Sequence, residues 1–141
     1  MSMMKLHWSP RSPYVRKVMI AAHELGLADR LQTVRTVVAM DKPVPELMVE
    51  NPLSKIPTLV TEDGMILYDS VVIMEYFDSL VGGGRLIPAS GPARFIELRR
   101  HALANGFLDV LIYWRTERAR EVPLPSMLHT YQTKLDAILP A

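Results

Sequence analysis

Residues 9–17, SPRSPYVRK, decide how the fold begins, because they mark the change from a strand to a helix. The short segment before them, residues 5–8, ends at this Ser/Pro cluster and predicts a first strand. Ser12 followed by Pro13 is typical of a helix start, with a hydroxyl at the N-cap and a proline at the first helical position. Apolar residues then recur at helical spacing as far as Gly26, which favours the end of a helix.

Further along the chain, the pattern returns to strands. Residues 31–38 are rich in β-branched side chains and predict a second strand. Two apolar runs within residues 58–68 flank an Asp-Gly pair at 63–64, which is a strong signal for a hairpin turn. Asp69 or Ser70 can cap the helix that follows. The order strand, helix, strand, then hairpin and helix, predicts an α/β fold with a small mixed sheet covered by helices.

The character of the sequence changes after three consecutive glycines. Helical patterns cover residues 93–118 and 125–139, and no strand signal appears past residue 90. We therefore expect a first domain over residues 1–82, a linker over 83–92 and the start of an all-helical domain over 93–141. Two helices have few neighbours against which to bury apolar faces, so the chain looks shortened or completed by a partner.

The composition excludes several classes of protein. The chain has 141 residues, 49% of them hydrophobic and 22% charged, which is typical of a globular protein rather than a disordered one. With a net charge of +1 and no basic block, neither nucleic acid nor an anionic membrane is an expected partner. No run approaches the ~20 apolar residues of a membrane span, and no signal peptide is apparent, so we expect a cytoplasmic protein.

Cysteine is absent, which removes disulfides, thiolate metal sites and a cysteine nucleophile together. The four histidines are scattered without ligand spacing, so we expect no metal site. A charged run at residues 115–120 is typical of a solvated helix face.

Three segments carry residues suited to binding. A serine at a helix N-terminus, such as Ser12, can donate a hydrogen bond to the thiolate of a bound ligand while its oxygen still caps the helix. Its alternative is a plain structural cap. In NPLSKIPTLV, residues 51–60, a proline before a strand often marks a cis bond. The main chain of Ile56 can then pair with an extended peptide and Lys55 with a carboxylate; the alternative is an ordinary trans turn with a solvated lysine.

The third segment is Asp69-Ser70, where an acid and a hydroxyl beside unpaired N–H groups suit an amino-acid head group, besides capping the helix. Together and in this order, SPRSPYVRK, NPLSKIPTL and LYDSVVIMEYF resemble the N-terminal domain of the glutathione transferases over residues 4–88. The later stretches ELRRHALANGFLDVL and WRTERARE resemble the first two helices of the C-terminal domain in bacterial members.

The resemblance implies a thioredoxin-like first domain with a role for each matching position. Ser12 matches the serine or cysteine that steadies the glutathione thiolate, with Ser9 as the alternative. Pro57 matches the family's cis-proline, and Ile56 matches the residue whose main chain pairs with the cysteinyl part of glutathione. Lys55 lies where the family meets the glycine end.

Asp69 and Ser70 match the acid–serine pair that holds the γ-glutamyl head. The implied function is a glutathione transferase acting in detoxification, with glutathione as co-substrate, a small and largely apolar electrophile, and a homodimeric assembly. Serine rather than cysteine at position 12 favours conjugation over thiol transfer. The alternative is a catalytically weak, transferase-like module that binds glutathione or another protein. The helix with the charged run borders the electrophile pocket in the family, so its other implied role is contact with an acidic substrate.

Overall fold

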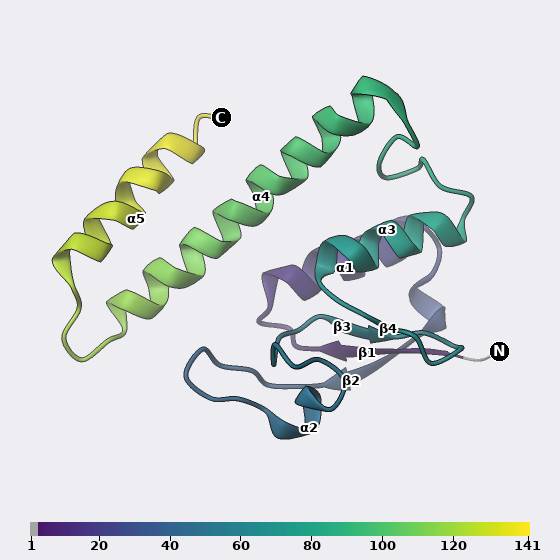
Figure 1. Cartoon of the computed structure of the whole chain (residues 1–141), viewed down its shortest axis with the longest axis horizontal. Helices are drawn as coiled ribbons and strands as arrows, with labels where there is room; N and C mark the ends of the chain where they lie inside the picture. Colours follow the sequence, from purple (N-terminus) through teal and green to yellow (C-terminus); the bar gives the residue numbers. More distant parts are fainter. Residues whose placement is uncertain (1–2) are drawn as a thin grey trace. The chain divides into compact units, whose positions relative to one another are not determined.

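The computed structural model describes residues 3–141, and the chain divides into two compact units (Figure 1). The first unit ends at Gly91 and the second is Pro92–Ala141. No helix within residues 3–141 is long and apolar enough to cross a membrane.

The first unit is built on a four-stranded sheet with the order β2-β1-β3-β4. Its strands are β1 (Met4–Trp8), β2 (Leu31–Arg35), β3 (Thr58–Val60) and β4 (Ile66–Leu67). β1 pairs with β2 in parallel, whereas β1–β3 and β3–β4 are antiparallel. This mixed sheet confirms the predicted thioredoxin-like arrangement of a strand–helix–strand unit and a hairpin.

The second strand is shorter than predicted, because it ends at Arg35 rather than residue 38. β1 ends at Trp8. Just past the end of β2, the Thr36 N–H donates to the Trp8 carbonyl oxygen at 2.8 Å. Beyond that point β1 turns away at a Ser-Pro pair, so residues 37 and 38 have no neighbouring strand with which to pair.

Two helices cover one face of the sheet, α1 (Pro13–Glu24) and α3 (Ser70–Leu80), and they lie side by side in Figure 1. A 3-10 turn (Ala28–Arg30) and the short α2 (Pro45–Met48) complete the unit. Side chains from β1, β3, α1 and α3 form the core beneath these helices: Met4, Leu6, Val18, Ala22, Leu59, Ile73 and Phe77. Gly26 follows α1 with φ +70°, a conformation that glycine adopts without strain.

The segment that leaves α3 is held by a buried carboxylate. Asp78 is 4% exposed and accepts hydrogen bonds from the main-chain N–H groups of Gly84, Arg85 and Leu86 at 3.0, 3.0 and 3.1 Å. The glycines at 82–84 all have positive φ, which lets the chain curl around this carboxylate. The segment over residues 82–86 is therefore an ordered turn around one side chain.

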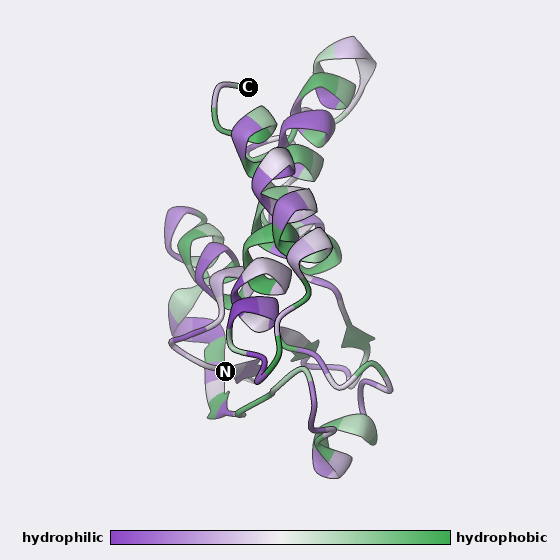
Figure 2. Cartoon of the chain, turned by 90° about the vertical axis from the view of Figure 1, so that its left-hand side faces the viewer, coloured by the Kyte–Doolittle hydropathy of each residue, from purple (hydrophilic) through white to green (hydrophobic). Residues whose placement is uncertain are grey.

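The second unit holds α5 (Pro125–Ile138) and all of α4 (Gly91–Arg118) except its first residue, and both helices lie close to the predicted bounds. Figure 2 shows hydrophobic and hydrophilic residues mixed along both helices. Several large apolar side chains of this unit are exposed: Phe95, Ile96, Leu103, Val122 and Leu139.

Candidate functional site

The topology of the sheet brings the three binding segments to one edge. β3 runs antiparallel to β1, with Thr58 opposite His7, so β3 begins where β1 ends. β4 runs antiparallel to β3 and therefore ends at the same edge. The helix starts that follow β1 and β4 and the loop that precedes β3 consequently meet there. Residues about 60 positions apart in the sequence thus share one surface.

Ser12 is the N-cap of α1, as the sequence predicts. Its hydroxyl oxygen accepts a hydrogen bond from the Val15 N–H at 3.2 Å, and its side chain is half-buried. The hydroxyl proton is not used by this bond, so it remains available for an acceptor outside the helix. Ser9 differs, because it is 7% exposed and its oxygen meets the Arg11 N–H at a long 3.4 Å.

The loop before β3 approaches the start of α1. The Ile56–Pro57 peptide bond is cis, as expected. Ile56 is buried in a cluster with Val15 of α1 and Leu47 of α2, which places this loop one helical turn from Ser12. Among the described residues, no hydrogen bond to the main chain of Ile56 is present. Lys55 next to it is exposed.

A buried amide that the sequence analysis missed organises this loop. Asn51 is 1% exposed, and its Nδ2 donates to the Lys55 carbonyl oxygen at 3.1 Å and to Thr58 Oγ1 at 2.9 Å. Its Oδ1 accepts from the Leu53 N–H at 3.0 Å. Thr58 Oγ1 also donates to the Lys55 carbonyl oxygen at 2.9 Å. The main chain around Lys55 is therefore fixed from inside the loop.

Asp69 and Ser70 lie at the start of α3. Asp69 is the N-cap, and its Oδ1 accepts from the Val71 N–H at 2.9 Å while the residue itself stays exposed. Ser70 is the first helical residue and is 1% exposed. The prediction that Asp69 or Ser70 caps the helix is confirmed for Asp69. An exposed carboxylate beside the unpaired N–H groups of a helix start offers both an acceptor and donors to a ligand.

A second feature absent from the sequence analysis is a polar cluster around Glu50. The Glu50 carboxylate pairs with Lys5 Nζ and, at 2.7 Å, with His7 Nε2. The other ring nitrogen of His7 lies 2.8 Å from Thr36 Oγ1. Burial raises the pKa of the Glu50 carboxyl, but the hydrogen bonds from Lys5 and His7 lower it by more, so the pKa lies below its ordinary value. No local pattern signals this cluster, because its members are far apart in sequence.

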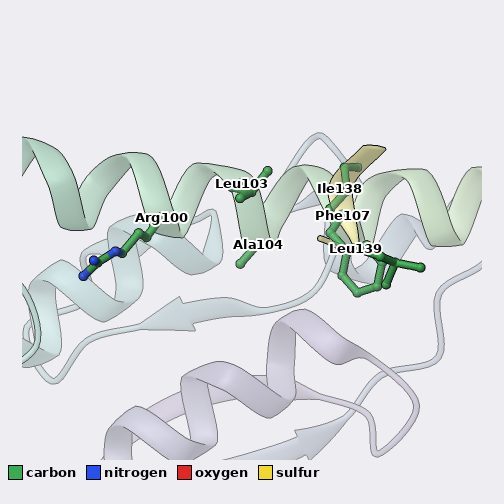
Figure 3. Close-up of a pocket in the computed structure, with 6 residues that line it drawn as sticks. All are labelled: Arg100, Leu103, Ala104, Phe107, Ile138 and Leu139. Carbon is green, nitrogen blue, oxygen red and sulfur yellow. The ribbon is translucent and has the colours of Figure 1, made fainter. Parts of the chain in front are cut away.

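The second unit contains an open apolar pocket of about 290 Å³ between α4 and the end of α5. Figure 3 shows Phe107 close to Ile138 and Leu139, with the Arg100 guanidinium at the opposite end. Its remaining lining residues, Leu103 and Ala104, are apolar. The lining holds no nucleophile or general acid, so this pocket is suited to apolar contact rather than to chemistry.

The charged run at the end of α4 departs from the predicted solvated face at one residue. Glu117 is 5% exposed; its Oε1 accepts from the Leu124 N–H at 2.7 Å, and its Oε2 lies 3.1 Å from Arg120. The chain reverses between α4 and α5, and the N-cap of α5, Leu124, has no side-chain cap. The buried Glu117 carboxylate therefore accepts the hydrogen bond of a main-chain N–H at the start of α5. The neighbouring Arg115 and Arg118 are exposed, as predicted.

Comparison with known proteins gives consistent matches. A family model described as glutathione S-transferase, N-terminal domain, matches residues 11–80. A glutathione transferase family member from Pseudomonas fluorescens Pf-5, whose crystal structure holds bound glutathione, is 37% identical with a TM-score of 0.92. The alignment covers 97% of this chain and 68% of that one. A further crystal structure of such a protein from this organism, holding S-(propanoic acid)-glutathione, is 36% identical with a TM-score of 0.86 over 97% of this chain and 67% of that one.

Two curated proteins add to these matches. The uncharacterized GST-like protein YibF of Escherichia coli (strain K12) is 35% identical over 118 residues, which cover 83% of this chain and 56% of YibF. A stringent starvation protein A homolog from Coxiella burnetii is 33% identical over 93 residues, which cover 66% of this chain and 42% of that protein. The chain spans about half the length of these curated relatives.

Proposed function

The chain belongs to the glutathione S-transferase family, and from this premise we propose that it binds glutathione and activates its thiol for attack on a small electrophile. The observation that carries the proposal is the meeting of Ser12, Ile56 and Asp69 at one edge of the sheet. The glutathione bound to the 37% identical relative supports the choice of ligand.

In this proposal Ser12 is the partner of the glutathione thiolate. Its oxygen caps α1 through the Val15 N–H, so its proton can be donated to sulfur without loss of the cap. The unpaired N–H groups at the start of α1 add a favourable potential for a negative charge. Ser9 is the weaker candidate because its oxygen already faces the Arg11 N–H and because it does not cap α1.

The rest of glutathione is assigned to the two neighbouring segments. The main-chain N–H and carbonyl of Ile56 pair with the cysteinyl residue, next to the cis bond at Pro57. The ammonium of Lys55 meets the glycine carboxylate. Asp69 accepts from the γ-glutamyl ammonium, and Ser70, which is 1% exposed, offers its main-chain N–H at the start of α3 to the γ-glutamyl carboxylate.

The chemistry follows from these contacts. Glutathione supplies the sulfur nucleophile that the Cys-free chain lacks. The thiol loses its proton to solvent, and the hydrogen bond from Ser12 lowers the free energy of the thiolate. A thiolate held beside an electrophilic carbon forms a carbon–sulfur bond with it, while the bond from that carbon to its leaving group breaks and the leaving group departs to solvent with the electron pair. Charge stabilisation and proximity lower the barrier to this step. The substrate class in this proposal is small and largely apolar, and its role in the cell is detoxification.

A second candidate is a catalytically weak module that binds glutathione or a protein partner. One observation favours it: a curated relative that is 33% identical carries the name of a starvation protein rather than a transferase.

Substitution of Ser12 separates the two candidates. We first expect reduced glutathione at about 100 times its dissociation constant to stabilise the wild-type chain by about 2.7 kcal/mol in a thermal melt. Ser12→Gly should then lower the conjugation rate about 10²–10³-fold, as removal of a donor to a developing charge does, while binding persists. Glycine keeps most of the cap, so the fold is retained. A wild-type chain that binds glutathione but conjugates nothing would favour the module, and loss of activity in Ser9→Ala alone would make Ser9 the thiolate partner.

The proposal extends to the organisation of the protein. We place the glutathione-binding domain at residues 1–82, the linker at 83–92 and the helical domain at 93–141, in a cytoplasmic homodimer. A Cys-free chain is compatible with a reducing compartment. Thermal melts at two protein concentrations test the dimer, since only the melting temperature of an oligomer depends on concentration.

A further inference from the structure

We propose that Glu50, held by Lys5 and His7, is a positioning residue that fixes the glutathione-binding loop over residues 51–57; this inference rests on the proposed function. We call Lys5, His7 and Glu50 the Glu50 cluster. None of its members is among the residues assigned to contact glutathione. Their effect on binding is therefore indirect and acts through the loop.

The geometry of the Glu50 cluster ties the loop to the central strand. Glu50 follows the short α2 and directly precedes the loop, whereas Lys5 and His7 both lie on β1. One carboxylate oxygen pairs with Lys5 Nζ, and the other lies 2.7 Å from His7 Nε2. A carboxylate with both oxygens engaged by two side chains of one strand has a fixed orientation as well as a fixed position.

The ring of His7 is itself held in place. His7 is 9% exposed, and its Nδ1 lies 2.8 Å from Thr36 Oγ1 beyond the end of β2. Because both ring nitrogens have partners, the ring cannot turn without breaking a hydrogen bond. Glu50 is thus attached to a rigid point of the sheet rather than to a mobile surface side chain.

The bonds that follow carry this constraint to Ile56. Asn51 is the next residue after Glu50, and it donates to the Lys55 carbonyl oxygen and to Thr58 Oγ1. Thr58 pairs with His7 across the sheet. The connections therefore close a ring that runs from His7 through Glu50, Asn51 and Thr58 and back to His7. Lys55 and Ile56 lie between Asn51 and Thr58, so both ends of their segment are held by this ring.

The Glu50 cluster differs from an ordinary surface pair in its His7–Glu50 contact, because the His7 side chain is 11% exposed, whereas the Lys5 side chain is 36% exposed. Arg30 and Glu62 also form an ion pair, at 2.9 Å, with about a third of each side chain exposed (33% and 32%). Such a pair contributes little to stability. Glu62 lies in the turn between β3 and β4, at the opposite end of β3 from Thr58. Glu62→Gln is therefore a matched control for Glu50→Gln.

The test measures glutathione affinity by calorimetry for the wild type, Glu50→Gln, Lys5→Gln, the double variant and Glu62→Gln. We expect Glu50→Gln to weaken the binding of reduced glutathione about threefold to tenfold. This is the size of effect that substitutions without ligand contact have when they act through hydrogen-bonded neighbours. Glu62→Gln should leave the affinity unchanged. In the double variant the losses should be less than the product of the single ones, since both substitutions break the same contact.

Amide hydrogen exchange on the ligand-free chain distinguishes a local effect on the loop from a general loss of stability, because a general loss would speed exchange in the strands as well. The amides of residues 53–56 should exchange faster in Glu50→Gln, while those of β1 and of β3 keep their wild-type rates. If Glu50→Gln does not fold, Lys5→Gln takes its place, because it leaves the His7–Glu50 contact intact. Its expected effects are smaller but fall on the same amides.

The outcomes separate this inference from the proposed function. A wild-type chain that does not bind glutathione overturns both. A wild-type chain that binds, together with a Glu50→Gln variant of unchanged affinity, overturns the inference alone. Uniformly faster exchange across the sheet and the loop also overturns it, since the cluster then stabilises the whole unit rather than positioning the loop.

Discussion

Replacing Asn51 with aspartate exchanges a buried amide for a carboxylate of the same size, so it changes hydrogen bonding while the volume stays constant. Asn51 Nδ2 donates two bonds, to the Lys55 carbonyl oxygen and to Thr58 Oγ1. A carboxylate donates neither and faces the Lys55 carbonyl with a second acceptor. Because Asn51 is 1% exposed, water cannot replace the lost partners.

The magnitude follows from these contacts. Two lost hydrogen bonds cost about 2 kcal/mol, at about 1 kcal/mol each. A buried charge without a cationic partner adds to this, so we expect Asn51→Asp to lower the free energy of unfolding by about 3–5 kcal/mol in all. A domain is stable by only about 5–15 kcal/mol, and each kcal/mol shifts the melting temperature of a chain this long by about 3–4 °C. The melting temperature should fall by about 9–20 °C.

Circular dichroism melts at pH 7 measure this effect. The matched control is Gln32→Glu, which makes the same amide-to-carboxylate change at an exposed residue of β2 and should alter stability by less than about 0.5 kcal/mol. Below about pH 4 the new carboxyl is protonated and can donate again, so the Asn51→Asp variant should approach the wild type. Equal melting temperatures for Asn51→Asp and Gln32→Glu at pH 7 would refute the reasoning.

Three further predictions concern acids held by hydrogen bonds. Asp78→Asn keeps one carbonyl oxygen but turns an amide group toward a linker N–H, so it should cost about 2 kcal/mol by urea unfolding, whereas Asp41→Asn at an exposed turn should cost almost nothing. Glu117→Gln should destabilise the second unit by about 1–2 kcal/mol, seen as faster exchange at the Leu124 amide, because a charged acceptor becomes neutral. The lowered pKa of Glu50 means that its stabilising contribution is present above its unfolded pKa and lost as the pH falls through the folded one. The stability gap between wild type and Glu50→Gln should therefore be full at pH 7 and close on acidification; a constant gap would contradict it.

Much of the fold could be predicted from the sequence, because the signals that set it are local. Ser12-Pro13 begins α1, Gly26 ends it and the Asp-Gly pair turns the hairpin, each through the conformational preference of one or two residues. The end of β2 was mispredicted, because β-branched residues continue to position 38 while the partner strand stops at Trp8. The extent of a strand depends on its neighbour, and that neighbour is not encoded locally.

The candidate site divides in the same way. Ser12, Ile56 and Asp69 stood out because each sits next to a helix start or a proline, and their common edge follows once the strand order is known. Glu50 and Asn51 did not stand out. Glu50 meets His7 across 43 residues of sequence, and a lone glutamate after a short helix gives no sign of such a contact.

Asn51 and Asp78 share a property that bears on how the chain distributes its tasks. Each is buried at a bend, and each directs its hydrogen bonds mainly to main-chain groups. Main-chain groups are the same whatever the residue, so a loop held in this way keeps its path when its exposed side chains change. Leu53 and Lys55 are exposed on the loop that Asn51 holds. The buried amide thus determines where the loop lies, and the exposed residues are left to determine what it meets.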